Sequence, residues 1–409
     1  MAKDYKDLVV GLDIGTAKVM VVVAEVLPGG ELKLAGLGVA PSYGLKRGAV
    51  VNIDATVQSI QQALKEAELM ADCKITRVYT GITGSHIRGM NSSGMVAIKD
   101  KEVTAADVAR VVDTARAINI STDQRLLLVE PQEFMIDNED VREPIGMSGI
   151  RLEAKVHIVT GAQSAAENII KCVRRCGLEV EQLLLNPLAS SLSVLTADER
   201  ELGVALVDIG AGTTDVAIFT GGAIRHTAVI PIAGDLITSD IAMALRTPTK
   251  DAEDIKVESG YAKQLLADPQ DQVETPGLGD RGPRTISRQA LAGVIEPRVD
   301  EIYQLVQQVI RESGYEEVLS SGIVITGGTA VMPGMVELGE DIFLKPVRRG
   351  IPKYVGALSD MVAQPRSATV MGLLEEARLA RVRGQKVAQK NGSVKTAFGR
   401  FKDLIVRNF

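Results

Sequence analysis

Two stretches of the chain carry the same unusual turn, and together they constrain the fold more than any other feature. The first is residues 13–16, DIGT, after the apolar run 8–12, and the second is residues 208–215, DIGAGTTD, after the apolar run 204–207. Each turn leads back into a β-strand pattern rather than into a helix. The two turns therefore predict a protein built of two related halves.

The residue types in these turns suit a phosphate chain. Glycines such as Gly15, Gly210 and Gly212 allow backbone N–H groups to approach an anion closely, and threonine hydroxyls add donors. A carboxylate such as Asp13 or Asp208 repels phosphate unless a divalent cation with its waters lies between them. The pair of turns predicts one shared site for a phosphate chain and Mg²⁺.

Two other phosphate-binding patterns are excluded. The sequence contains no GxxxxGK[ST], so the chain is not a P-loop protein. The spacing Gly210-x-Gly212 resembles a dinucleotide-binding turn, but such a turn opens a helix, whereas residues 216–219 continue as a strand. This context argues against NAD as the ligand.

A third element, residues 323–329, IVITGGT, predicts the nucleoside end of the same site. The apolar strand delivers Gly327, Gly328 and Thr329 at its end, where a flat base and a ribose can lie against bare backbone. A Gly-Gly pair after a strand is by itself usually a plain turn. The ligand interpretation becomes the stronger one because the pair follows a phosphate turn that repeats an earlier one.

Composition limits the class of protein. A chain of 409 residues with 45% hydrophobic and 24% charged residues is globular and long enough for two or more domains. Three cysteines cannot form a disulfide framework, and three scattered histidines predict no metal cluster. The start predicts no signal peptide, and no apolar run approaches the roughly 18 residues of a spanning helix. These features predict a cytoplasmic protein.

Charge is unevenly distributed along the chain. From Arg378 onward there are nine Lys or Arg residues and one Asp, so this end carries +8 while the rest carries −14 of the total −6. An acidic body is a poor nucleic-acid binder, so no nucleic-acid partner is expected.

Hydrophobic periodicity predicts alternating strands and helices. Strands are expected within 8–26, 31–40, 77–82, 95–98, 125–130, 153–159, 202–219, 228–233 and 321–327, and helices over 54–71, 104–117, 164–176, 186–195, 237–245, 288–311 and 366–379. Asp54 is the expected N-cap of its helix, and Pro297 is expected to kink or break the long helix. Residues 268–283 are expected to form a surface loop, and 385–393 a polar linker.

The last 16 residues predict a basic amphipathic helix. At 100° per residue, apolar side chains fill one arc and polar or charged side chains fill the other, with Val406 as the exception. The members of this helix expected to meet a membrane are Lys395, Phe398, Arg400, Phe401, Lys402, Leu404, Ile405, Arg407 and Phe409. Docking on the protein body is the alternative, but a basic helix after a linker on an acidic body favours anionic lipid.

In these motifs the chain resembles a known superfamily, the actin, sugar-kinase and heat-shock-chaperone ATPases. Residues 13–18, 208–215 and 326–329 match their phosphate-1, phosphate-2 and adenosine motifs. Within it, the chain closely resembles the FtsA family of actin-like bacterial cell-division proteins over almost its full length. The matching segments are GLDIGTAKV (11–19), RG (47–48), AELMA (67–71), PQE (131–133), LASS (188–191), ERELG (199–203), IPIAG (230–234), SDIA (239–242), AEDIK (252–256) and VIEPR (294–298).

The resemblance implies an α/β, actin-like, two-lobed ATPase fold with duplicated subdomains. The first-lobe core would be 1–84, completed by 161–199 and about 362–382, and the second-lobe core would be 200–237 and 288–361. Residues 85–160 would form an inserted subdomain for subunit contacts, with a purely stabilising role as the alternative. A small subdomain (238–287), a linker (383–393) and the terminal helix (394–409) would complete the chain.

The resemblance also implies the site residues for ATP and Mg²⁺. The nucleotide would be held by Asp13, Gly15, Thr16, Lys18, Asp208, Gly210, Gly212, Thr213, Thr214, Glu253, Lys256, Gly327, Gly328 and Thr329. Asp13 and Asp208 would hold magnesium through water. From the residues alone, Glu253 and Lys256 would be an exposed i, i+3 pair on a helix, worth roughly 0.2–0.5 kcal/mol.

Hydrolysis is expected to be weak at most. The chaperone relatives place an acidic residue before the proline that starts the connecting helix, and here that position is Asn186. An amide can orient a water molecule but is no general base. Gln163 and Asp208 are the other candidate catalytic residues, so ATP binding is the expected activity.

The implied role is a filament that anchors the division ring to the cytoplasmic face of the bacterial inner membrane. Its implied partners are other copies of the chain, anionic lipid, other division proteins and the C-terminal peptide of FtsZ. That peptide would dock on the small subdomain, where Arg284, Arg288 and Arg298 are candidates for its acidic groups, with a solvated basic face as the alternative.

Three rival functions follow from the same superfamily. A metabolic kinase would need a catalytic Asp near the phosphates and a polar substrate cleft, and a chaperone ATPase would need a further substrate-binding domain. A pilus-assembly adaptor would lack the terminal helix. The terminal helix and the insertion at 85–160 together favour the cell-division protein.

Overall fold

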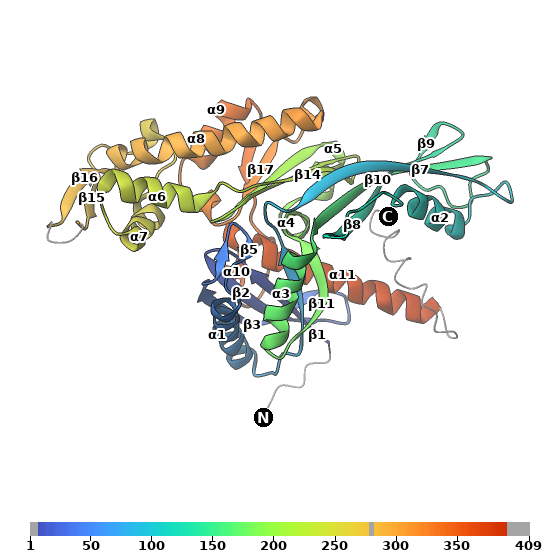
Figure 1. Ribbon diagram of the computed structural model, residues 1–409, viewed down its shortest axis with the longest axis horizontal. Helices are drawn as coiled ribbons and strands as arrows, with labels where there is room; N and C mark the ends of the chain where they lie inside the picture. The colour runs from blue at the N-terminus through green and yellow to red at the C-terminus, as the bar shows by residue number, and fades with distance from the viewer. Residues whose placement is uncertain (1–6, 278–281, 391–409) are drawn as a thin grey trace.

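A five-stranded sheet forms the centre of the first lobe in this computed structural model, which describes residues 7–277 and 282–390 (Figure 1). Its strand order is β11-β6-β1-β2-β3. The strands are β1 (Leu8–Ile14), β2 (Lys18–Val26), β3 (Leu32–Pro41), β6 (Arg77–Ile82) and β11 (Glu179–Leu185). The helices α1 (Ile53–Ala71) and α3 (Gln163–Arg175) cover one face, and α4 (Asn186–Val194) and α11 (Ala368–Lys390) cover the other.

The second lobe repeats this plan with the equivalent order β18-β17-β12-β13-β14. These strands are β12 (Val204–Ile209), β13 (Thr214–Thr220), β14 (Ala223–Ile230), β17 (Ile323–Thr326) and β18 (Val347–Arg349). In each sheet the first strand pairs antiparallel with the next along the chain and parallel with a later one. The duplication predicted from the two turns is therefore confirmed.

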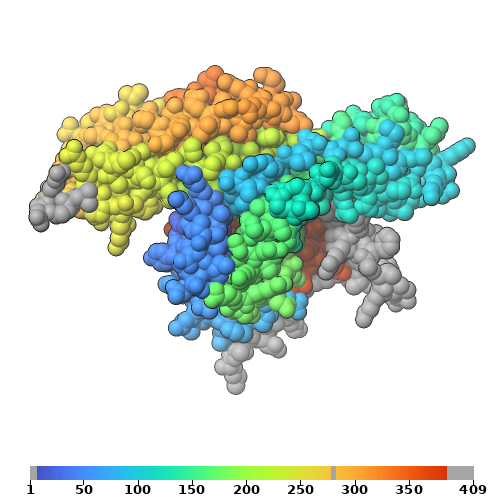
Figure 2. All heavy atoms as spheres, viewed as in Figure 1, coloured from blue at the N-terminus to red at the C-terminus, as the bar shows by residue number. Residues whose placement is uncertain are grey.

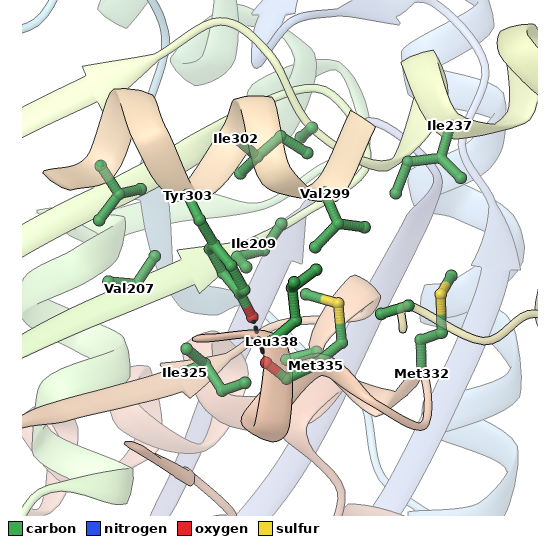
Figure 3. Close-up of a cluster of buried hydrophobic side chains, with 14 of the residues drawn as sticks. Val207, Ile209, Ile237, Val299, Ile302, Tyr303, Ile325, Met332, Met335 and Leu338 are labelled. Carbon is green, nitrogen blue, oxygen red and sulfur yellow. Dashed lines mark hydrogen bonds between the residues drawn. The ribbon is translucent and has the colours of Figure 1, made fainter. Parts of the chain in front are cut away.

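The core of the second lobe lies between its sheet and the long helix α8 (Arg288–Ser313) (Figure 3). Tyr303 points from α8 into this core, where it is fully buried and its hydroxyl donates a 2.9 Å hydrogen bond to the carbonyl of Met335. Its ring lies 4.9 Å from that of Phe343. The buried polar end of this large side chain is thus satisfied, as buried tyrosines require.

Further helices and a hairpin build the rest of the second lobe and its small subdomain. They are α5 (Ala197–Leu202), α6 (Gly234–Leu245), α7 (Thr249–Ser259) and α9 (Met335–Phe343), with the hairpin β15 (Gln272–Thr275) and β16 (Arg284–Ser287). The first lobe also carries α10 (Ser359–Val362), whose Val362 packs in its core, and the short pair β4 (Leu45–Lys46) and β5 (Ala49–Val50).

The inserted subdomain has its own sheet, of order β7-β10-β8-β9, with one helix against it. Its elements are β7 (Arg88–Ala97), α2 (Ala105–Ala115), β8 (Gln124–Ile136), β9 (Glu139–Val141) and β10 (Arg151–Ala162). Thr104 and Asp107 form a capping box at the start of α2. In Figure 2 this subdomain and the small subdomain lie at opposite ends of the second lobe.

Four local predictions differ from the structure. Asn52, not Asp54, caps α1, because its side chain accepts from the N–H of Ala55. Pro297 does not break α8, which runs on to Ser313. The expected loop 268–283 contains β15, whose partner strand β16 lies just beyond it. Helix α11 extends to Lys390, into the expected linker, and it continues through Gly384, which costs a helix only about 1 kcal/mol relative to Ala.

In the described part of the chain, no helix is long and apolar enough to cross a membrane. The expected amphipathic helix 394–409 lies outside the described residues.

Candidate functional site

A cleft of about 590 Å³ lies between the two lobes and brings the three predicted motifs together. Its walls include thirteen of the expected nucleotide-site residues and Asn186. The thirteen are Asp13, Gly15, Thr16, Lys18, Asp208, Gly210, Gly212, Thr213, Glu253, Lys256, Gly327, Gly328 and Thr329. Residues separated by more than 300 positions thus meet at one site.

The two phosphate-type turns have the same internal hydrogen bond. The N–H of Gly15 donates to the carbonyl of Lys18 at 2.9 Å, and the N–H of Gly210 donates to the carbonyl of Thr213 at 2.9 Å. Both turns close an antiparallel hairpin, β1 with β2 and β12 with β13. The same sequence pattern therefore produces the same backbone on both sides of the cleft.

Three carboxylates, those of Asp13, Asp208 and Asp215, lie buried on the cleft wall, and the first two are neighbours. Asp208 accepts from Ser190 Oγ at 2.6 Å and from Thr369 Oγ1 at 3.3 Å, and Asp13 lies 3.5 Å from the ammonium of Lys18. Burial raises the pKa of Asp13, and burial together with the charge of Asp13 raises the pKa of Asp208 to about 6. Two neighbouring buried carboxylates with raised pKa values favour a bound cation, because the cation would compensate their negative charge.

The donor set fits Mg²⁺ held through water better than a protein cage. Among the described residues, no group of three or more His, Cys, Asp or Glu side chains is arranged to hold a metal ion. Mg²⁺ typically keeps several waters and takes one or two carboxylates together with phosphate oxygens. Asp13 and Asp208 are the residues that would hold it.

Sequence reasoning gave no role to Asp215, the last residue of the second turn. Asp215 is buried at the cleft and accepts a 2.5 Å hydrogen bond from Thr83 Oγ1 of the first lobe. Burial and the nearby charge of Asp208 raise its pKa well above the ordinary value. Its place in the turn motif was the available signal, but its partner lies 132 residues away in sequence.

Lys256, one of the residues expected beside the nucleoside, lies on the cleft wall, and α7 places it inside the protein. Its ammonium donates to the carbonyl of Gly234 at 3.2 Å, to Thr238 Oγ1 at 2.9 Å and to Glu253 at 2.6 Å. The side chain is buried. The alternative of an exposed surface pair is therefore wrong for Lys256.

The glycine strand end is tied to the second phosphate turn. Thr329 Oγ1 donates to the carbonyl of Gly210 at 2.8 Å. Gly327 has a φ of +89°, and a Cβ there would lie 2.4 Å from an oxygen of Asp208. A side chain at this position would displace the carboxylate, so the glycine is needed for the close approach.

The candidate catalytic residues occupy different places. Asn186 lies on the cleft wall, and its buried Oδ1 atom has no hydrogen-bond partner among the described residues. Gln163 does not line the cleft, because its side chain extends along α3 and donates to Glu167 at 2.7 Å. Thr214 is also absent from the wall, since its buried hydroxyl donates to the carbonyl of Ile232.

The three candidate partner arginines are all engaged within the protein. Arg284 donates to the carbonyl of Leu245, and Arg298 pairs with Asp240 at 2.6 Å. Arg288 pairs with Asp271 at 2.8 Å, and it also lines the cleft. This position of Arg288 was not expected from the sequence.

Two lobes of equivalent strand order around a cleft, with a phosphate-type turn from each, define the actin-like class of folds. Solved structures agree on the fold. The PilM-PilN type IV pilus biogenesis complex matches with a TM-score of 0.64 at 18% identity, covering 90% of this chain and 98% of that one. MreB5 of Spiroplasma citri bound to AMPPNP matches with a TM-score of 0.57 at 16% identity, covering 95% and 100%.

Sequence comparison narrows the class to one family. The family model for cell division protein FtsA matches residues 205–372, and that for the SHS2 domain inserted in FtsA matches residues 84–160. The cell division protein FtsA of Pseudomonas aeruginosa is 58% identical over 90% of this chain and 88% of its own length, and that of Neisseria meningitidis is 50% identical over 95% and 94%. The chain belongs to the FtsA family of cell division proteins.

Proposed function

We propose that this protein binds ATP with Mg²⁺ in the cleft between its lobes and uses the bound nucleotide to set the angle between them. The observation that carries the proposal is the pair of equivalent turns, which face each other across the cleft and carry buried carboxylates. Phosphates joined to both turns would hold the lobes together.

Binding rather than turnover is the proposed activity. Asn186 stands where a general base would be needed, and its free amide oxygen can accept a hydrogen bond from water. Asp208 is committed to Ser190 and Thr369, and it is a proposed magnesium residue. We therefore expect hydrolysis far below the 1–100 per second typical of kinases.

The ATP-bound protein is proposed to assemble into filaments on the cytoplasmic face of the inner membrane at the division site. The inserted subdomain would supply subunit contacts, and the sequence 394–409 would supply the membrane contact. Each of its basic side chains near anionic lipid is worth about 1 kcal/mol. In this role the protein would anchor FtsZ filaments and help to recruit other division proteins.

Deleting residues 394–409 is expected to leave a folded protein that no longer sediments with anionic vesicles. The lipid-facing apolar and basic residues are lost together, and both contribute to interfacial binding. With ATP, electron microscopy on anionic lipid monolayers should show filaments for the full chain and none for the deleted form. Filaments of the deleted form on lipid, or sedimentation unchanged by the deletion, would contradict the membrane proposal.

The C-terminal peptide of FtsZ is proposed to dock on the small subdomain and the start of α8. Arg298 is one quarter exposed and faces Asp240 and Glu301, so an acidic peptide would compete with these partners. Arg284 lies on β16 at the same end of the lobe. Arg288 is proposed to act differently, because its guanidinium lies on the cleft wall.

Charge reversal separates these two roles. Arg288→Glu is expected to weaken ATP binding about tenfold, the effect of losing one contact of about 1.4 kcal/mol, and to leave the affinity for the FtsZ peptide unchanged. Arg298→Glu should weaken binding of the FtsZ peptide and leave the affinity for ATP unchanged. Both affinities can be measured by fluorescence anisotropy with the purified full chain. Loss of peptide binding alone in Arg288→Glu would return that residue to the partner surface.

A further inference from the structure

The inserted subdomain contacts both lobes, although its chain connects only to the first. It leaves the first lobe after Thr83 and returns through β10 into α3. Its sheet nevertheless packs along β14, the edge strand of the second lobe. Figure 1 shows β7 and β10 reaching across to β14. The insertion is therefore a second connection between the lobes, separate from the cleft.

This contact is a network of hydrogen bonds, which we call the polar seam. It consists of Asn91, Gln132, Glu133 and His157 from the insertion and Arg225 and Thr227 from β14. Gln132 Nε2 donates to the carbonyl of Ile224 at 2.8 Å, and Asn91 Nδ2 donates to that of Arg225 at 3.2 Å. The side chains thus occupy acceptors that an edge strand leaves open.

His157 lies at the centre of the seam. Its Nδ1 lies 2.7 Å from Asn91 Oδ1, and its Nε2 lies 2.9 Å from Thr227 Oγ1. The side chain is 1% exposed, and burial, with a smaller effect of His226, lowers its pKa to about 4. The ring is therefore neutral near pH 7, with Nδ1 donating to Asn91 and Nε2 accepting from Thr227.

The same strands connect the seam to the cleft. Thr227 on β14 pairs with Ala217 on β13, and two residues earlier on β13 lies Asp215, which pairs with Val229. Asp215 in turn accepts the 2.5 Å hydrogen bond of Thr83, the residue immediately before the matched SHS2 domain at 84–160. The hydrogen-bonded strands β13 and β14 therefore contact the insertion in two places. Asp215 on β13 binds Thr83, where the insertion begins, and β14 packs along the sheet of the insertion.

We propose that the polar seam couples occupancy of the cleft to the orientation of the inserted subdomain. A ligand that draws the two phosphate turns together moves β13, and β14 moves with it because the strands are hydrogen-bonded. The insertion must then follow β14 or release it. By linkage, loosening the seam must change ligand affinity by the same factor. The inference rests on nucleotide binding in the cleft as proposed above.

The test uses variants of the full chain that touch the seam but not the cleft. Asn91→Ala with Gln132→Ala removes donors to β14 at positions that are not fully buried. We expect this double variant to change the Kd for ATP with Mg²⁺ about fivefold or more, the lower range of measured couplings. Ser93→Ala, an exposed change on the same strand, is the control and should leave the Kd unchanged.

Hydrogen exchange supplies the second measurement. In the wild type, ATP with Mg²⁺ should change amide protection in both β14 and β7, and the double variant should keep the response in β14 and lose it in β7. An unchanged Kd in a double variant whose β14 exchanges faster would overturn the coupling and leave nucleotide binding intact. Failure of the wild type to bind nucleotide would instead overturn the proposed function, and the inference with it.

Discussion

Replacing Gly212 with valine is expected to weaken nucleotide binding about 100-fold while leaving each lobe folded. A Cβ at this position would lie 2.6 Å from Thr16 Oγ1 and 2.9 Å from the Cα of Arg47, both in the first lobe. Overpacking of this kind costs about 1–3 kcal/mol. Because the clash lies between the lobes, moving them apart relieves it, and this separates the two phosphate turns.

Gly29→Val is the matched control. Gly29 lies in an exposed turn, and a Cβ there meets nothing within 4 Å. Fluorescence titration with an ATP analogue, with and without Mg²⁺, should show wild-type affinity for Gly29→Val and almost none for Gly212→Val. Normal binding by Gly212→Val, with an unchanged melting temperature, would show that ligand binding does not require the close approach of the turns.

The two turns could be predicted because the residues that form each turn are consecutive in the sequence. Carboxylate, glycine and threonine follow an apolar strand within eight positions, and the hairpin that closes the turn uses the same residues. The equal strand order of the lobes follows from the same repeat. The helix expected over 104–117 is found as α2, and its capping box is local in sequence, since Thr104 and Asp107 are three residues apart.

Contacts between distant residues could not be predicted in this way. The bond between Thr83 and Asp215 joins two lobes, and the burial of Lys256 depends on α6 and α7 packing together. The prediction for Gln163 was wrong because its position in the sequence does not reveal that its side chain runs along α3 toward Glu167. Arg288 belongs both to α8 and to the cleft wall, and only the folded chain reveals this.

Asp208→Asn is expected to make the ligand-free protein more stable and to remove the tightening of nucleotide binding by Mg²⁺. The pKa of Asp208 in the folded protein is about 6, raised from 3.8 mainly by burial. That difference corresponds to about 3 kcal/mol of destabilisation once the group is ionised. The neutral amide avoids this cost, although it loses part of the hydrogen bonding from Ser190 and Thr369.

The sign of the pH dependence follows from the raised pKa. Between pH 4 and pH 6 the folded state binds more protons at Asp208 than the unfolded state does, so the stability of the wild type falls as pH rises. The gain from Asp208→Asn should therefore be largest above pH 6 and disappear toward pH 4. Urea unfolding at several pH values measures it, with the exposed Asp100→Asn as control.

Once ligand and Mg²⁺ are present, the carboxylate of Asp208 should stabilise the folded protein instead of destabilising it. Mg²⁺ between Asp208 and a phosphate would compensate the buried charge, so in the wild type the ligand and metal together should raise the melting temperature more than the ligand alone. In Asp208→Asn this extra increase should vanish. If Asp208→Asn were no more stable than the wild type, ionisation of Asp208 would not destabilise the folded protein. If Mg²⁺ still added to the ligand-induced rise in melting temperature, Asp208 would not be part of the metal site.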